Sequence, residues 1–385
     1  MRFLKLLVKF SREKSLATTL IIIFLFFSFL FVFEKPLVYS VLLTTEAIQN
    51  FPVHPLNILG YKVLKEEVSY YSSGKKIRAF IYRPKAKGLF PVMVFSVGAT
   101  KYGVDDPQLD RFSYALAKVG IIAFAPDVPL LKEEVVLKES ITDYISAYNF
   151  IYDQPYVNKS KVGFAGFCVG GSLSFVAATN KAIHDKVAYI VLISPYFDNL
   201  KAVMSVITRT NEVDGKVEKW MPHPQSIEIV RNGFIAFLHD PDERKLLRNL
   251  LIEDKKVLSD EDNDNLSDYG KLIFETFQTR DRTKFLEIYN SFPDEGKENF
   301  KELSPKYVVS DLNKNTKVFL LVDKHDSYVP ESETIDFQKN VPISGFSEVD
   351  SYAHARPGVG LPRFKVFVEF GKLFLFLHGV LKVVI

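Results

Sequence analysis

Short apolar runs and helically spaced segments alternate along the middle of the chain. Four continuous runs are typical of strands buried on both faces of a sheet, at residues 92–96, 121–125, 161–167 and 187–193. Three intervening segments have apolar residues at helical spacing, at residues 108–119, 140–152 and 169–179. Because the links are short, this order predicts an α/β fold, a mostly parallel twisted sheet with helices on both faces.

Other patterns flank this alternation. Residues 61–71 and 76–82 surround Ser72-Ser-Gly74 and predict an antiparallel hairpin. After Tyr196 the strand pattern stops for about 110 charged residues that are rich in helix formers. We therefore expect residues 61–196 to form the first part of a core, residues 197–314 a helical cap insertion, and residues 315–385 the second part. The second part is predicted as a strand, a helix, a weaker strand and a closing helix, at residues 317–322, 331–339, 343–349 and 361–385.

The N-terminal pattern differs from the rest. Residues 16–33 (LATTLIIIFLFFSFLFVF) carry no charge and would extend roughly 27 Å as a helix, enough to cross a bilayer. Basic residues precede them, which favours a cytoplasmic N-terminus. Residues 1–36 are thus expected to be a single-pass transmembrane signal anchor and residues 37–60 a membrane-proximal segment, with the catalytic domain on the extracytoplasmic side. A cleaved signal peptide is the alternative, although Val38-Tyr-Ser40 matches a cleavage site poorly.

Charge and cysteine content narrow the possible chemistry. The chain has 49 basic and 46 acidic residues, so its net charge of +3 indicates no nucleic-acid footprint. The single cysteine, Cys168, excludes an internal disulfide and a multi-cysteine metal site. We expect no metal and no cofactor. The acidic segment at residues 260–268 is similar to a calcium loop, but Asn265 and Lys271 stand where glycine and glutamate are needed, which favours a solvated acidic turn.

Cys168 lies between a predicted strand and a predicted helix, in Gly166-Phe-Cys168-Val-Gly170-Gly171. This spacing fits a nucleophile elbow, in which small residues two positions before and after the nucleophile let strand and helix approach. A lone cysteine is more often an inert core residue. In this motif it is a candidate nucleophile, and the Val169 amide at the start of the helix can donate to an oxyanion.

The motif resembles the cysteine elbow of the dienelactone hydrolase group in the α/β-hydrolase superfamily. The resemblance covers about residues 61–196 and 315–385. It implies the chain order nucleophile, acid, histidine. By position it assigns the acid to Asp326, in an Asp-Ser-Tyr-Val-Pro loop, and the base to His354, before the closing helix.

Some assignments stay open under this resemblance. Asp323 and Asp198 are alternatives for the acid, and His325 is expected to be exposed. The loop Ser96-Val-Gly98-Ala99 would supply the second oxyanion amide from Ala99. Dienelactone hydrolases carry a glutamate in this loop that contacts the cysteine, and Gly98 stands in its approximate place here.

These features predict a membrane-anchored hydrolase of a carboxylic ester, thioester or lactone that acts through a Cys168–His354–Asp326 triad and an acyl-thioester intermediate. The expected partners are a small apolar substrate and the membrane, and no nucleic acid. Two alternatives are a non-catalytic binding protein that keeps the hydrolase shell, and an acyltransferase. The final helix is strongly apolar, but charged residues interrupt it, which favours a closing helix of the fold over a second span.

Overall fold

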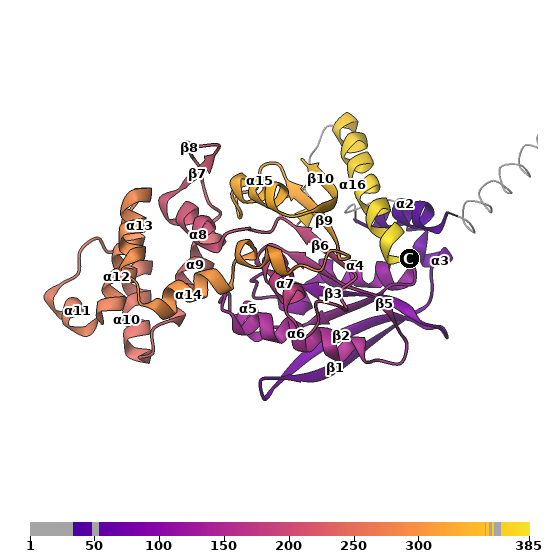
Figure 1. Cartoon of the computed structure of the whole chain (residues 1–385), viewed down its shortest axis with the longest axis horizontal. Coiled ribbons are helices and arrows are strands. Elements are labelled where there is room, and N and C mark those ends of the chain that lie inside the picture. The colour runs from indigo at the N-terminus through magenta and orange to yellow at the C-terminus, as the bar shows by residue number, and fades with distance from the viewer. Residues whose placement is uncertain (1–33, 48–53, 351, 354–355, 358–362) are drawn as a thin grey trace, which may run out of the picture.

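The computed structural model describes residues 34–47, 54–350, 352–353, 356–357 and 363–385 (Figure 1). The predicted membrane span at residues 16–33 and the predicted base His354 lie outside these residues. In the part of the chain that is described, no helix has both the length and the apolar character needed to cross a bilayer.

An eight-stranded sheet with the order β1-β2-β4-β3-β5-β6-β9-β10 forms the centre of the core. β2 pairs antiparallel with both β1 and β4, and all other neighbouring strands are parallel, as the sequence predicts. The strands are β1 (Val63–Ser72), β2 (Lys75–Pro84), β3 (Phe90–Ser96), β4 (Ile122–Pro126), β5 (Val157–Phe167), β6 (Tyr189–Ile193), β9 (Lys317–Asp323) and β10 (Ile343–Val349). The predicted hairpin is confirmed, and its turn uses positive φ at Ser73 and Gly74.

Helices cover both faces of the sheet because successive strand residues point to opposite sides. In β3, Val92 and Val94 pack into the core on one face, and Met93 and Phe95 pack into the core on the other. The first face is covered by α6 (Glu139–Tyr152), α7 (Val169–Thr179) and α15 (Glu331–Asn340). The second is covered by α2 (Lys35–Ala47), α4 (Pro107–Lys118) and α16 (Arg363–Val384). Two short helices, α3 (Leu56–Leu59) and α5 (Pro129–Lys132), lie in connections.

The helix α2 belongs to a region for which the sequence predicted only an anchor and a membrane-proximal segment. Leu42 and Leu43 are buried in the same core as side chains of α16, and α2 packs along that helix (Figure 1). The apolar residues of α2 continue an apolar stretch without a change of pattern, so periodicity did not mark it as a separate element. Part of the segment between the predicted span and the sheet is therefore built into the core.

The insertion is mainly helical, as expected, and extends away from the sheet (Figure 1). Its helices are α8 (Asn199–Thr208), α9 (Pro224–Ala236), α10 (Pro241–Ile252), α11 (Asp260–Asn265), α12 (Asp268–Gln278), α13 (Arg282–Asn290) and α14 (Asp294–Glu302). They share a hydrophobic core of their own. The hairpin of β7 (Thr210–Val213) and β8 (Lys216–Lys219) was not predicted from the sequence, because its half-exposed and exposed strands show no buried-strand pattern. Its Asp214-Gly215 turn was the available signal.

The acidic segment at residues 260–268 forms no simple turn, which corrects the sequence prediction. Ser259 caps the short helix α11: its side chain accepts from the Asp262 amide, and the Asp262 side chain accepts from the Ser259 amide. Such a capping box, with acidic residues in the first turn, favours helix initiation. The carboxylates therefore begin α11 and leave no loop of the calcium-binding type.

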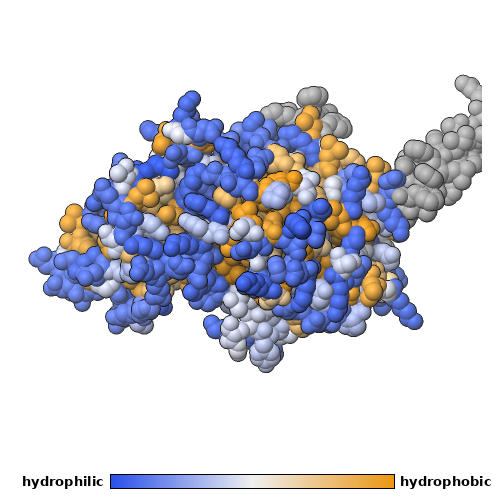
Figure 2. Space-filling model, in the orientation of Figure 1, coloured by the Kyte–Doolittle hydropathy of each residue, from blue (hydrophilic) through white to orange (hydrophobic). Residues whose placement is uncertain are grey.

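Apolar side chains are also exposed on α16. Val368 is 44% exposed and Leu375 is 66% exposed. On the face shown in Figure 2, hydrophobic residues gather over the core and α16, whereas the cap is mainly hydrophilic. The closing helix thus buries one side against the sheet and shows an apolar side to solvent.

Candidate active site

Cys168 occupies the sharp turn between β5 and α7. Its φ of +52° and ψ of −132° are unusual for a residue with a side chain. The backbone is held on both sides: the Cys168 amide donates to the Ile193 carbonyl at 2.8 Å, and its carbonyl accepts from the Gly171 amide at 2.9 Å. This strained strand-to-helix corner is the geometry of a nucleophile elbow.

The glycines around Cys168 allow the close approach that the elbow requires. A Cβ on Gly166 would lie 2.4 Å from the Gly171 Cα, and a Cβ on Gly170 would lie 2.2 Å from the Ser96 carbonyl oxygen. Both contacts involve backbone, which cannot move aside like the end of a side chain. The expectation of small residues two before and two after the nucleophile is thus confirmed in steric terms.

Two candidate oxyanion donors lie beside the thiol. Val169 is the first residue of α7, so its amide has no acceptor within the helix. Ala99 is buried in the loop after β3, directly after Gly98, whose backbone packs against Cys168. Neither the Val169 nor the Ala99 amide donates to another group among the residues that the structure describes. Both therefore have the free donor that an oxyanion hole needs.

The predicted acid Asp326 lies in the loop after β9. Its Oδ1 accepts from the amides of Tyr328 at 2.7 Å and Val329 at 3.0 Å. Tyr328 and Val329 also line the pocket that contains Cys168. The structure thus brings the predicted acid loop and Cys168 to one cavity. Asp323 stands at the end of β9, where its Oδ1 accepts from the His325 amide at 2.9 Å.

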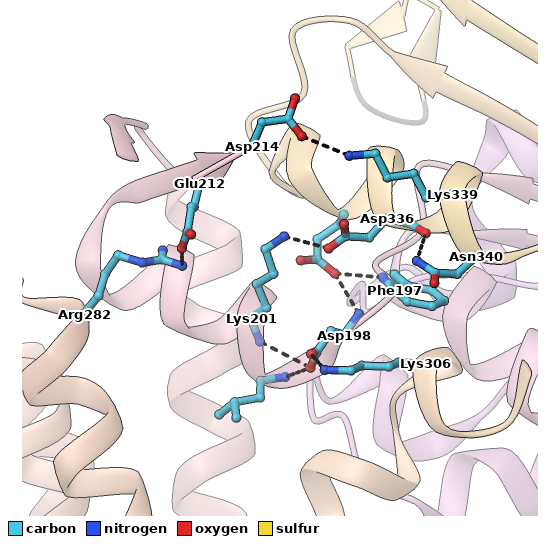
Figure 3. Close-up of polar contacts among 12 residues, drawn as sticks. Phe197, Asp198, Lys201, Glu212, Asp214, Arg282, Lys306, Asp336, Lys339 and Asn340 are labelled. Carbon is cyan, nitrogen blue, oxygen red and sulfur yellow. Dashed lines mark hydrogen bonds and ion pairs between the residues drawn. The ribbon is translucent and has the colours of Figure 1, made fainter. Parts of the chain in front are cut away.

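Asp198, the other alternative for the acid, lies at the junction of core and cap and makes several polar contacts there (Figure 3). Asp198 caps α8 by accepting from the Leu200 amide, and its Oδ2 accepts from the Lys306 ammonium at 2.8 Å. Its own amide and that of Phe197 donate to Oε2 of buried Glu333 at 2.7 and 2.9 Å. The Asp198 carboxylate therefore holds the first cap helix in place, a structural role that the sequence did not reveal.

Of the histidines near the candidate site, the structure describes His325 and His223 but not His354. His354 lies outside the described residues, in the segment between β10 and α16. The side chain of His325 is 77% exposed, in agreement with the sequence prediction. A third histidine, His223, was not singled out from the sequence. It caps α9 with Nδ1, which accepts from the Gln225 amide, and so its Nε2 carries the ring proton and can donate to the Tyr328 hydroxyl at 3.1 Å.

Residues of the cap donate hydrogen bonds to the backbone of the acid loop. The His223 amide donates to the Ser327 carbonyl at 2.7 Å, and the Ser226 hydroxyl donates to the Tyr328 carbonyl at 3.2 Å. The indole of Trp220 donates to the Asp326 carbonyl at 3.2 Å. Three successive carbonyls of the acid loop thus accept from cap residues, which couples the position of Asp326 to the insertion.

A pocket of about 710 Å³, including its open mouth, separates the core from the cap at Cys168. Its walls come mainly from α8, α9 and α14 and are mostly aliphatic and aromatic. The Tyr196 side chain is buried there and donates to the Leu303 carbonyl at 3.0 Å. Burial raises the pKa of Tyr196, and the nearby Cys168 acts in the same direction, so the phenol stays neutral. An apolar pocket with a candidate nucleophile in its wall suits an uncharged substrate.

Comparison with known proteins agrees with this geometry. The sequence profile of the Dienelactone hydrolase family matches residues 77–197, which extend from β2 to the segment after β6 and include Cys168. The sequence matches no protein among those with curated descriptions.

Several solved structures are similar to this chain at low sequence identity. An acylaminoacyl peptidase from Pyrococcus horikoshii is 14% identical, with a TM-score of 0.49 over 84% of this chain and 43% of that one. Dipeptidyl peptidase 4 from Porphyromonas gingivalis is 15% identical, with a TM-score of 0.45 over 85% of this chain and 38% of that one. A Klebsiella pneumoniae protein assigned as a dienelactone hydrolase is 14% identical, with a TM-score of 0.44 over 82% of this chain and 98% of that one. The chain thus spans about two fifths of the length of the two peptidases.

The strand order, the cysteine elbow after the central strand β5 and the acid loop after β9 define an α/β-hydrolase fold. Within this fold, residues 77–197 are similar to the Dienelactone hydrolase family.

Proposed function

We propose that the protein hydrolyses a carboxylic ester, a thioester or a lactone, with Cys168 as nucleophile, His354 as general base and Asp326 as the acid that orients the histidine. The observation that carries this proposal is the strained elbow at Cys168, which opens into an apolar pocket shared with the acid loop. A strained nucleophile is costly to maintain, and such strain is typical of catalytic positions.

The proposed reaction has two acyl-transfer steps. The Cys168 sulfur attacks the substrate carbonyl carbon while His354 takes the thiol proton, and the oxyanion accepts from the Val169 and Ala99 amides. Collapse of this intermediate expels the alcohol or thiol, which receives the proton from His354 and leaves an acyl thioester on Cys168. Water, deprotonated by His354, then attacks the thioester and releases the carboxylic acid and the free thiol.

We also propose a location at a membrane, with residues 16–33 as the span and the hydrolase domain on the extracytoplasmic side. The uncharged length of this segment and the basic residues before it support the proposal. The apolar pocket and the exposed apolar side of α16 suit a substrate that partitions into lipid.

The test uses the full chain in detergent, with a chromogenic butyrate ester and an iodoacetamide probe. Cys168→Ala and His354→Ala are expected to lose at least about 100-fold in ester turnover. Iodoacetamide should label the wild type at Cys168 and label His354→Ala several-fold more slowly. His325→Ala is the matched control, because that side chain is 77% exposed and should leave both rates unchanged. Turnover by His354→Ala at the wild-type rate would contradict the proposed triad.

A second candidate is a non-catalytic binding protein with the hydrolase shell. Gly98 favours it, because no acidic side chain projects towards the thiol from this position, unlike in dienelactone hydrolases. The same experiment separates the two: slow, histidine-independent labelling without turnover would support the binding protein.

A further inference from the structure

Three glycines lie inside helices of the cap, and they have different surroundings. A Cβ on Gly270 would lie 2.4 Å from Oε1 of Glu243, and a Cβ on Gly296 would lie 2.7 Å from the Tyr269 hydroxyl. Packing against neighbours therefore explains these two glycines. Gly233 has no such reason, because the nearest atom to a Cβ there is the Val136 carbonyl oxygen at 3.9 Å.

Backbone conformation does not explain Gly233 either. The residue lies within α9, and its φ is not positive. Glycine in a helix interior is less favourable than alanine, since it loses more conformational entropy on folding. Position 233 therefore has room for a side chain and a backbone that would allow one, yet the residue there is glycine.

The position faces the pocket at Cys168. Gly233 and Val136 both line this pocket, so a side chain at 233 would enter its space. The neighbouring wall residues of α9 are apolar, among them Ile229, Val230 and Phe234. The missing side chain thus enlarges an apolar space that begins at the thiol.

We propose that the pocket between α8, α9 and α14 binds the aliphatic acyl chain of the substrate, and that Gly233 determines the length of chain it accepts. This inference rests on the proposed function insofar as it names the acyl group as the occupant. The pocket contains Cys168 itself, and an acyl group becomes bonded to the nucleophile, so the acyl side of the substrate is the part that must fit this space. Each methylene group buried there should strengthen binding by roughly fourfold.

Alkylation of the single cysteine measures this pocket without any need for turnover. The full-length protein is treated with N-methyl- and N-octyl-iodoacetamide, and the rate of modification of Cys168 is followed by intact mass. The wild type should react at least about tenfold faster with the octyl reagent at equal subsaturating concentration. The octyl-to-methyl ratio should fall at least about tenfold in Gly233→Leu and about fourfold in Gly233→Ala.

Gly371→Leu is the matched control, because Gly371 lies in α16 with nothing within 4 Å of a built Cβ, and it should keep the wild-type ratio. Gly233→Ala protects the test against misfolding of the leucine variant, since alanine favours the helix. An equal octyl and methyl rate in the wild type, or an unchanged ratio in folded Gly233 variants, would overturn the proposal.

Ester assays show whether the pocket assignment or the proposed hydrolase activity has failed. If the Gly233 variants change the octyl-to-methyl ratio but the protein turns over no ester, the pocket assignment stands and the hydrolase activity is rejected. Turnover of butyrate ester with no effect of Gly233 on the ratio would reject the pocket assignment and keep the hydrolase.

Discussion

Gly98 packs directly against Cys168. A Cβ on Gly98 would lie 3.2 Å from the Cβ of Cys168 and 3.9 Å from its Sγ. Dienelactone hydrolases resemble this chain in the elbow but carry a glutamate at the approximate place of Gly98. Cys168 here therefore has a backbone neighbour where those enzymes have a carboxylate.

This relationship predicts the effect of restoring a charge. Gly98→Glu should slow alkylation of Cys168 at pH 7 by about tenfold, because a nearby negative charge disfavours the thiolate. The rate of iodoacetamide labelling against pH measures this. Gly98→Gln has nearly the same size without the charge, so equal slowing in both variants would assign the effect to crowding.

The second prediction concerns the elbow glycines. Gly170→Ala places a Cβ 2.2 Å from the Ser96 carbonyl oxygen, which should lower the free energy of unfolding by about 2–3 kcal/mol. Urea unfolding of the full chain is the measurement. Gly371→Ala should leave stability unchanged or slightly raised, because its surroundings are open. Equal stability of the two variants would contradict the steric account of the elbow.

The third prediction concerns the hydrogen bonds from the cap to the acid loop. Trp220→Phe removes the donor to the Asp326 carbonyl but keeps an aromatic ring. Ester turnover should fall about 3- to 10-fold as the acid loop loses its orientation, while iodoacetamide labelling of Cys168 should slow no more than in His354→Ala. Trp220→Leu serves as a comparison, since a larger loss there measures the packing of the ring separately from the hydrogen bond.

The fourth prediction concerns Glu333. Burial raises the pKa of this carboxyl from 4.5 to about 8, although two backbone amides donate to it. The folded state therefore holds a proton that the unfolded state loses above about pH 4.5. Stability contributed by this group falls as pH rises from about 5 to 8, by about 1.4 kcal/mol per pH unit, and stays low above that range.

Glu333→Gln should remove this fall, because the amide stays neutral and its oxygen can accept the same hydrogen bonds. The variant should gain stability relative to the wild type between pH 5 and pH 8, measured as urea midpoints at several pH values. Glu331→Gln, at an exposed position in the same helix, should follow the wild-type pH dependence. Parallel curves for wild type and Glu333→Gln would contradict the raised pKa.

Local patterns predicted most of the core. Strands such as β3 and β6 are continuous apolar runs because both of their faces are buried, and α7 begins and ends where the sequence indicated. The polar β7–β8 hairpin and the helix α2 were missed, since one lacks apolar periodicity and the other merges with an apolar stretch. Periodicity reports burial, so elements without a distinct buried face escape it.

The elbow could be read from the sequence because its requirements are local: a strand, a nucleophile between small residues, and a helix. The hydrogen bonds from Trp220 and His223 to the acid loop could not be read from the sequence. They join positions about 100 residues apart, and their acceptors are backbone carbonyls that carry no sequence signal. The same holds for Gly233, whose meaning depends on the open space opposite it. The sequence by itself determined the sheet and the elbow, whereas only the tertiary structure decided which side chains surround the thiol, since contacts between the cap and the core depend on how distant segments pack.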